Sequence, residues 1–373
     1  MADAARLMAR EIEPDVHLPY VRHVTETVIS LSTRALMTTI RLDGIAFETA
    51  DIGDLNDLHA KLNLTLRNLA DDRLAIWTHL IRRQDTGYPE GEFSSAFARD
   101  LDVGYREVLQ CTKLFRNELY LTIVAHPGRD RAEAAVGFVS RLGQARRGGG
   151  EVDAAALKRL NDAARDITAA LGRYGATQLG LVEKNGLLFS EPMRLLHLLA
   201  SSEDLPTALP QGRIGSAIYT NRVIFGREAI EVRAAGGSLF SGMFGLKEYP
   251  ASTRPGMLNG LLSAPFEFVL SQSFAFLSKA DAKKVLTRKQ NQLVSTQDVA
   301  ASQIDDLNDA LDDLESNRFV MGDHHLSLLV RAETPKTLLE TMAQARRVLA
   351  EAGSVVARED LGLEASYWAQ MPG

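Results

Sequence analysis

The stretch "GSLFSGMFGLK", Gly237 to Lys247, sets the expectation for the second half of the chain. Its glycines have the spacing of a phosphate-binding loop, G-x-x-x-x-G-K-[ST], whose backbone amides, lysine and hydroxyl hold a nucleotide and magnesium. Met243 and Phe244 occupy the positions that need lysine and then serine or threonine, so the stretch lacks that chemistry. Its apolar side chains alternate on both faces, which predicts a strand buried within a sheet.

Strand-like runs and helical patterns alternate on both sides of this stretch, and together they predict an α+β fold. We expect two mixed sheet-and-helix lobes, residues 1–150 and 210–373, joined by a mainly helical connecting segment at 151–209. The strand–helix–strand order suggests ferredoxin-like units. Two dipeptides, Asp43-Gly44 and Asn185-Gly186, predict hairpin turns because such turns need positive φ angles.

The longest predicted helix covers about residues 279–316 and begins with a capping box, Ser278 to Asp281. One side carries an apolar stripe, and the other side is strongly acidic. The acidic side is interpreted as a solvated face or as a partner-docking surface. A divalent-metal site is less favoured, since helical spacing alone does not bring carboxylates to one point. The stripe consists of Ile304, Leu307, Leu311 and Leu314, and the acidic residues are Asp305, Asp306, Asp309, Asp312 and Asp313.

Composition argues against several classes of protein. The 373 residues carry a net charge of −6 with a pI of about 5.8, which argues against a dedicated nucleic-acid binder. Arg146, Arg147 and the basic run Lys283 to Lys289 leave a local contact with DNA open, although we expect no direct DNA binding. The single cysteine, Cys111, excludes an internal disulfide and a cysteine metal cluster, and its helical setting predicts a buried thiol. The most apolar window is interrupted by a proline and a charge, so no membrane span is expected.

The search for catalytic signatures finds none. The chain has no H-E-x-x-H zinc motif, no G-x-S-x-G nucleophile motif and no Rossmann glycine fingerprint. His324 and His325 are adjacent on a predicted strand, so their side chains point to opposite faces and cannot share a metal through that spacing. We therefore expect no catalytic, cofactor-binding or metal-binding residue in this chain.

Several stretches of the chain, taken in order, resemble one known family. They are "LPYVRHVTETVISL", "IRLDGIAFET", "FGLKEYPASTRPGMLNGLLSAPFEFVLSQSFAFLS", "DHHLSLLVRAETPKTL" and "LGLEASYWAQMPG". Together they are similar to the N-terminal region of the VirB/TrbE/CagE transporter ATPases of bacterial type IV secretion and conjugation systems. The similarity covers nearly the whole chain, and the order of the pieces carries it rather than any catalytic motif.

The resemblance implies a docking role without catalysis. In this family the N-terminal region is similar to a platform that holds the motor at the cytoplasmic face of the inner membrane, contacts membrane subunits and helps to arrange hexamers. ATP and magnesium are then expected only in a C-terminal half, which in the family follows a segment like Trp368 to Gly373, so we expect the chain to be a fragment. The segment "EPDVHLPYVRHV", residues 13–24, is expected to be a docking strand or a core strand.

Two alternatives stay open beside this resemblance. The chain is either a stand-alone α+β scaffold, or an enzyme with an unrecognised metal-dependent site, for example near Asp305 to Asp313. The resemblance leaves open whether the exported substrate is DNA or protein.

Overall fold

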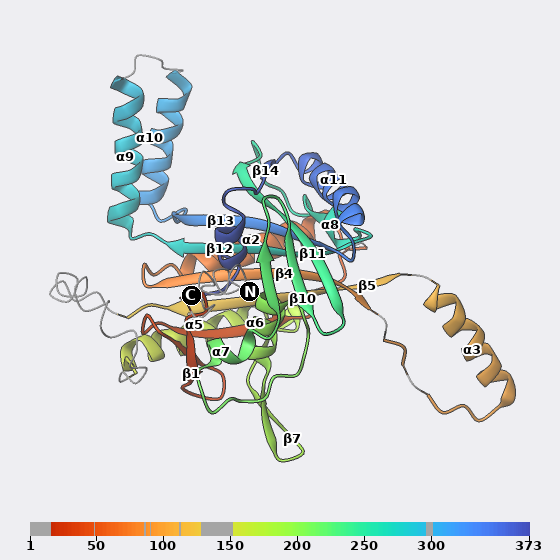
Figure 1. The fold of residues 1–373 in the computed structure, drawn as a ribbon. Helices are drawn as coiled ribbons and strands as arrows, with labels where there is room; N and C mark the ends of the chain where they lie inside the picture. Colours follow the sequence, from red (N-terminus) through yellow and green to blue (C-terminus); the bar gives the residue numbers. More distant parts are fainter. Residues whose placement is uncertain are drawn as a thin grey trace, which may run out of the picture.

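The computed structural model describes residues 16–47, 49–85, 87–89, 91–111, 113–127, 152–295 and 301–373. It confirms the α+β class: a 12-stranded sheet runs through the molecule, and helices pack on both of its faces (Figure 1). The strand order is β1-β2-β3-β5-β4-β12-β13-β11-β10-β9, with β6 added beside β3 and β14 added beside β11.

The elements have the following bounds. The strands are β1 Tyr20–His23, β2 Ile29–Leu31, β3 Leu36–Leu42, β4 Leu74–Asp85, β5 Leu114–Ala125, β6 Thr177–Gln178, β7 Leu181–Lys184, β8 Leu187–Ser190, β9 Arg222–Phe225, β10 Ile230–Ala234, β11 Gly237–Glu248, β12 Glu267–Phe276, β13 Gly322–Ala332 and β14 Val355–Arg358. The helices are α2 Ile52–Asn68, α3 Ala96–Gln110, α5 Ala154–Ala170, the 3-10 turn η2 Gly172–Tyr174, α6 Glu191–Ser201, α7 Ile214–Ile218, α8 Asn259–Leu262, α9 Lys279–Ser295, α10 Ala301–Glu315, α11 Pro335–Glu351 and α12 Leu363–Trp368.

The large sheet contains two β-α-β-β-α-β units of the ferredoxin-like kind. The first unit is β3-α2-β4-β5-α5-β6, and its strands lie in the order β6-β3-β5-β4. The second unit is β11-α8-β12-β13-α11-β14, and its strands lie in the equivalent order β14-β11-β13-β12. Strand β11 contains the opening stretch and is paired on both sides, by β13 and by β10 and β14, so the prediction of a buried strand is confirmed.

The two units join edge to edge through strands β4 and β12. These strands pair antiparallel from Ala75 opposite Ala275 to Arg82 opposite Phe268. The strands of the two expected lobes therefore share one sheet. The connecting segment 151–209 contributes α5 and β6 to the first unit, while α6 packs elsewhere. The lobe boundaries themselves stay a prediction.

Alternation along the strands places an apolar core on each face of the sheet. Leu80 and its cross-strand partner Leu270 face the side of the sheet that α8 and α11 cover in the second unit. In the first unit, α5 covers the same side of the sheet. The neighbouring residues Ile81 and Val269 face the opposite side, where they join the core formed with α6, α7 and α12. Helices on both faces leave the sheet surface largely covered.

The C-terminal segment is fixed in the core on the α6 side. The hydroxyl of Tyr20 donates to the carbonyl of Pro372 over 2.8 Å. The Nε2–H of buried His79 donates to the carbonyl of Gln370, also over 2.8 Å. Strand β1 ends the strand order and begins with fully buried Tyr20, and Leu18 just before it is also fully buried, so β1 is an edge strand and a core strand at once.

One predicted hairpin turn is confirmed and the other is wrong. Asn185 and Gly186 both have positive φ angles, 52° and 75°, and connect β7 to β8 as a two-residue hairpin needs. Asp43 and Gly44 instead donate their backbone N–H groups to the carbonyl of Tyr174. The described residues between Gly44 and α2 form no strand. These two hydrogen bonds hold the chain against η2, so it does not turn back to pair with β3.

The single long helix expected at 279–316 is also wrong. Helices α9 and α10 lie side by side, and the side chains of Gln290 and Asn308 are hydrogen-bonded over 2.8 Å. In one continuous helix these two residues would stand about 27 Å apart, at 1.5 Å per residue. Each half has helical periodicity as predicted, but the chain reverses between them. No helix within the described ranges has the length and apolar character that crossing a bilayer requires.

Candidate docking surfaces

Two helical insertions leave the sheet at equivalent points of the two units. Helix α3 is inserted between β4 and β5, and the pair α9–α10 is inserted between β12 and β13. Figure 1 shows both insertions standing away from the sheet, on different sides of the molecule. Helix α3 has no extensive packing against any other described helix or strand, whereas α9 and α10 pack on each other. These projections are the candidate docking surfaces of the chain.

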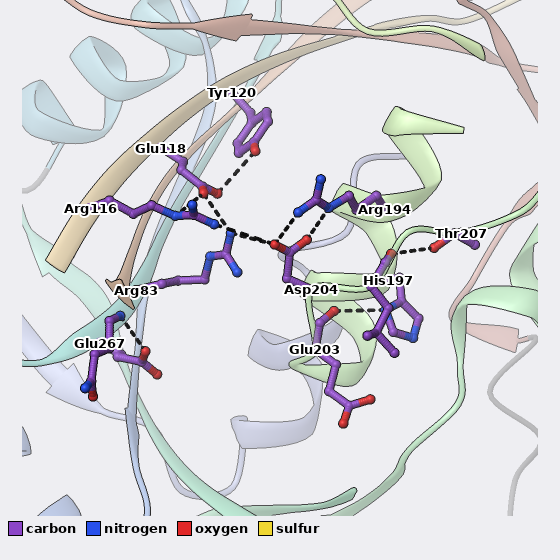
Figure 2. Close-up of polar contacts among 12 residues, drawn as sticks. Arg83, Arg116, Glu118, Tyr120, Arg194, His197, Glu203, Asp204, Thr207 and Glu267 are labelled. Carbon is purple, nitrogen blue, oxygen red and sulfur yellow. Dashed lines mark hydrogen bonds and ion pairs between the residues drawn. The ribbon is translucent and has the colours of Figure 1, made fainter. Parts of the chain in front are cut away.

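A charge network fixes the base of the β4–β5 ribbon that leads to α3 (Figure 2). Arg83 of β4 lies 2.7 Å from Glu118 of β5 and 2.9 Å from Asp204, which follows α6. Arg116 of β5 lies 2.9 Å from Glu118. Arg194 of α6 holds Asp204 through both Nε and Nη2, the latter at 2.6 Å. The network therefore ties both strands of the ribbon to α6.

The charges of this network are nearly balanced. Three arginines face two carboxylates, which leaves one positive charge. Burial opposes ionisation of Asp204, but hydrogen bonds from Arg194 and the charges of Arg83 and Arg194 outweigh it and lower the pKa of Asp204. Burial, with the charge of Glu118, raises the pKa of Tyr120, whose hydroxyl donates to that carboxylate over 3.2 Å. Both carboxylates are occupied by arginine, so neither is available as a general base.

A buried histidine positions the loop that carries Asp204. The Nδ1 of His197 is hydrogen-bonded to the carbonyl of Glu203 at 2.9 Å, and its Nε2 is hydrogen-bonded to the hydroxyl of Thr220 at 2.7 Å. Both ring nitrogens therefore have partners inside the fold, and Figure 2 shows the contact with Glu203. We interpret His197 as a structural residue, because its hydrogen bonds hold the loop rather than face a cavity.

Helix α3 starts with a side-chain cap, and one side of the helix contacts the segment that connects it to β4. The hydroxyl of Ser95 accepts a hydrogen bond from the backbone N–H of Ala98, as an N-cap should. On the inner side, the Tyr88 hydroxyl donates to Asp102 over 2.6 Å. The guanidinium of Arg106 lies 4.4 Å from the centre of the Tyr88 ring. These contacts define which side of the helix faces inward.

The outer side of α3 carries an uncovered apolar stripe. Phe97, Leu101, Tyr105 and Val108 are spaced by four, four and three residues, so they share one helix face. Their exposed fractions are 77%, 63%, 59% and 64%. A contiguous exposed apolar patch on an otherwise polar surface marks an interaction site more often than a folding defect. We call these four residues the α3 stripe.

The prediction that the thiol of Cys111 is buried is wrong, because α3 does not pack against a core in the described part of the chain. Cys111 ends α3 as its C-cap residue, and its free thiol is exposed rather than buried. A helical setting predicted burial because most helices in a compact fold pack against a core. Helix α3 has no such partner among the described elements, so the residues of its outer side stay accessible to solvent.

The α9–α10 hairpin buries its apolar side within itself. Ala282 of α9 and Leu314 of α10 are 1% and 4% exposed. At its base, Lys283 lies 2.7 Å from Glu315. The Ser278 hydroxyl accepts from the backbone N–H of Asp281, which is one of the two hydrogen bonds of the predicted capping box. The outward sides of the two helices are mostly polar or charged, although Val285 of α9 is 49% exposed.

The two helices of the hairpin carry opposite charge. The outer face of α9 forms a shallow basic groove that includes Lys283, Lys284 and Arg288. Asp305, Asp309 and the other acidic residues follow the side of α10 without converging. Within the described residues, no group of three histidine, cysteine, aspartate or glutamate side chains is placed to hold a metal ion. Arg146 and Arg147 lie outside the described residues.

The adjacent histidines of β13 point to opposite faces, as predicted. The Nδ1 of His324 is hydrogen-bonded to the hydroxyl of Tyr249 at 2.7 Å. The Nε2 of His325 is buried on the other side and has no hydrogen-bond partner among the residues that the structure describes. Burial, together with the charge of His325, lowers the pKa of His324. The pair therefore does not form a shared metal site.

Reasoning from sequence named the acidic side of α10 as a possible docking surface, but it missed the α3 stripe and the charge network. The spacing of the α3 stripe was visible, but the same spacing is typical of a helix face that packs on a core. The charge network was not visible, because Arg83, Arg116 and Asp204 come from segments far apart in the chain. Only the pairing of β4 with β5, and the packing of α6 beside them, brings those residues together.

Comparison with known proteins accounts for most of the chain. Residues 177–373 match the CagE, TrbE, VirB family, described as a component of the type IV transporter system. Residues 27–132 match the N-terminal domain of the type IV secretion system ATPase VirB4/TrbE. Both descriptions agree with the resemblance found in the sequence.

Curated relatives agree with these matches. The chain is 48% identical to the type IV secretion system protein virB4 of Bartonella henselae, over 98% of this chain and 47% of that protein. It is 40% identical to protein virB4 of Agrobacterium fabrum, over 96% and 45%. It is 32% identical to the type IV secretion system protein PtlC of Bordetella pertussis, over 95% and 43%. The chain spans about half the length of these relatives, and it belongs to the CagE, TrbE, VirB family of type IV secretion system ATPases.

Proposed function

We propose that this chain is the docking and assembly part of a VirB4-type secretion ATPase. In this role it anchors the motor to inner-membrane subunits of a type IV secretion machine, at the cytoplasmic face of the membrane, for export of DNA or protein. One observation carries the proposal. The sheet faces are covered by the chain's own helices, whereas two insertions at equivalent positions present uncovered, patterned surfaces.

The length of the relatives supports a division of labour. This chain corresponds to about half of each curated relative. We propose that the other half of a full-length protein binds ATP and magnesium, hydrolyses ATP and forms the hexamer with help from this part. No residue of this chain is assigned a catalytic role, and no direct contact with DNA is proposed.

A membrane-retention experiment tests the proposal. The tagged chain is expressed with the inner-membrane subunits of its own secretion machine, the membranes are solubilised in detergent, and the subunits that co-purify are identified. We expect one or more membrane subunits to be retained, while an unrelated α+β protein with the same tag retains none. Retention of no subunit would contradict the docking role.

A turnover assay on the purified chain tests the catalytic half of the proposal. We expect no ATP hydrolysis above the buffer control. Hydrolysis that is lost when a residue of this chain is substituted would overturn the proposal in favour of an enzyme with an unrecognised site.

A further inference from the structure

We infer that the α3 stripe binds a cationic amphipathic segment of an inner-membrane subunit, next to where that subunit enters the bilayer. This inference rests on the proposed docking function and names its surface and the chemistry of its partner. The stripe itself supplies an apolar contact. The residues beside it decide which partner can make that contact.

The flank of the α3 stripe is acidic. Asp100 and Glu107 each precede a stripe residue by one position, and they are seven residues apart, about two helical turns. They therefore lie on the same side of the stripe. Both are exposed, and the described residues provide no ion pair for either carboxylate.

The basic residues of α3 lie away from this flank. Arg106 turns to the inner side, where it is stacked on Tyr88 and lies 3.9 Å from Asp102. Arg99 precedes Arg106 by seven residues and so projects from the same side of the helix. The outer side of α3 thus combines the four apolar residues of the stripe with two carboxylates that have no ion pair among the described residues, and Val103, 54% exposed, lies between these two carboxylates.

This charge pattern disfavours two of the three possible occupants. An anionic lipid surface attracts amphipathic helices with basic flanks and repels acidic ones. A second copy of the chain, paired by two-fold symmetry, brings the same patch of both molecules together. When the two copies of α3 run antiparallel, Asp100 and Glu107 of one copy would meet the acidic flank of the other. A cationic amphipathic segment matches both the stripe and its flank.

The cytoplasmic segments of inner-membrane proteins have this chemistry. Short cytoplasmic loops close to membrane spans carry an excess of lysine and arginine. A helix with an apolar face and basic borders can lie along α3 by ordinary helix-to-helix packing. One helix face buries less than the ~800 Å² per partner of a standard stable interface, so we expect micromolar affinity that weakens with salt.

The test measures binding of a probe peptide to the whole chain by fluorescence anisotropy. The probe is an amphipathic Leu/Lys helix as long as α3, and a Leu/Glu helix of the same pattern serves as its counterpart. We expect the Leu/Lys peptide to bind and the Leu/Glu peptide to bind at least about tenfold more weakly, a difference of about 1.4 kcal/mol. Failure of the Leu/Lys peptide to bind would overturn the inference.

Charge reversal gives the sharper arm of the test. The double variant Asp100→Lys with Glu107→Lys should exchange the preference, so that the Leu/Glu peptide binds better than the Leu/Lys peptide. Leu101→Asp should weaken binding of both peptides about tenfold or more. The matched control reverses two exposed charges on α2, outside both insertions, Asp54→Lys with Asp57→Lys, and should leave binding unchanged. Circular dichroism verifies that each variant is folded.

The remaining outcomes separate this inference from the proposed function. If the control pair changes binding as much as the α3 pair, the effect is net charge and the inference is overturned. Binding to phosphatidylserine vesicles, or self-association of the chain, that Leu101→Asp abolishes would assign the stripe to lipid or to a second copy instead. If membrane subunits still co-purify fully with Leu101→Asp, docking occurs through another surface, and the proposed function stands while this inference fails.

Discussion

Helix α3 and the α9–α10 hairpin occupy the same position in two related units, yet they have opposite surfaces. The hairpin has two helices that cover each other's apolar sides, so it presents charge to solvent. The insertion at α3 is a single helix, so its apolar stripe stays open. A single inserted helix leaves its apolar face available to a partner, whereas two inserted helices can bury apolar residues against each other.

The two insertions are also attached to the body in different ways. The ribbon that leads to α3 is fixed by the charge network around Asp204. The hairpin is held by its own apolar seam, with the Lys283–Glu315 pair at its base.

Removal of Asp204 should have the largest effect. Asp204→Ala leaves Arg83 and Arg194 without their shared carboxylate in a site where the Asp204 side chain is 13% exposed. We expect the free energy of unfolding to fall by about 3 kcal/mol, as for other broken buried ion pairs. Urea unfolding measures the change. Asp162→Ala removes an exposed partner of Arg165 and should change stability by less than about 0.5 kcal/mol; equal effects would show that the network does not fix the ribbon.

Acid should destabilise the body of the molecule rather than either insertion. Burial lowers the pKa of His79 to about 4, despite its hydrogen bond to Gln370, whereas an unfolded histidine titrates near 6.5. The folded state keeps this histidine neutral, so its contribution is complete above pH 6.5 and is lost as the pH falls toward 4. Over that window we expect a loss of up to about 3 kcal/mol.

Stability measured as a function of pH checks this expectation. Burial lowers the pKa of His23 and His324 as well, so these partly exposed residues act in the same direction. His79→Gln should remove most of the slope between pH 6.5 and 4 while keeping a hydrogen-bond donor for Gln370. An unchanged slope in that variant would assign the acid response to other groups.

Matched leucine substitutions should separate the two insertions. Leu314→Ala opens the seam of the hairpin, where the side chain is 4% exposed, and should lower stability by about 2–3 kcal/mol. Leu101→Ala removes a side chain that is 63% exposed and should change stability by less than about 0.5 kcal/mol. Hydrogen exchange of the α9 and α10 amides localises the effect. A large loss for Leu101→Ala would mean that α3 is packed in solution.

The exposed ion pair at the base of the hairpin should matter least. Lys283→Ala removes a partner of Glu315 that is itself half exposed. Solvent and salt screen such pairs, so we expect no change in the melting temperature beyond experimental scatter. A clearly lower melting temperature for Lys283→Ala, with no change for Leu314→Ala, would show that the ion pair rather than the apolar seam holds the hairpin.

Local signals in the sequence predicted secondary structure correctly where contacts with residues distant in sequence did not compete with them. The dipeptides Asn185-Gly186 and Asp43-Gly44 carry the same turn signal, and only the first forms a hairpin. The second loses its turn because the carbonyl of Tyr174, distant in sequence, accepts its N–H groups. The helical periodicity of residues 279–316 was likewise right within each helix and wrong about the reversal between them.

By itself the sequence determined the α+β class, the buried strand β11, the absence of known catalytic motifs and the family. Those properties depend on side-chain periodicity and on the order of motifs, which are written along the chain. Only the tertiary structure decided that two units share one sheet through β4 and β12, and that Asp204 meets arginines of β4, β5 and α6. It also decided that the α3 stripe is uncovered, because an apolar helix face looks the same in sequence whether or not another element packs against it.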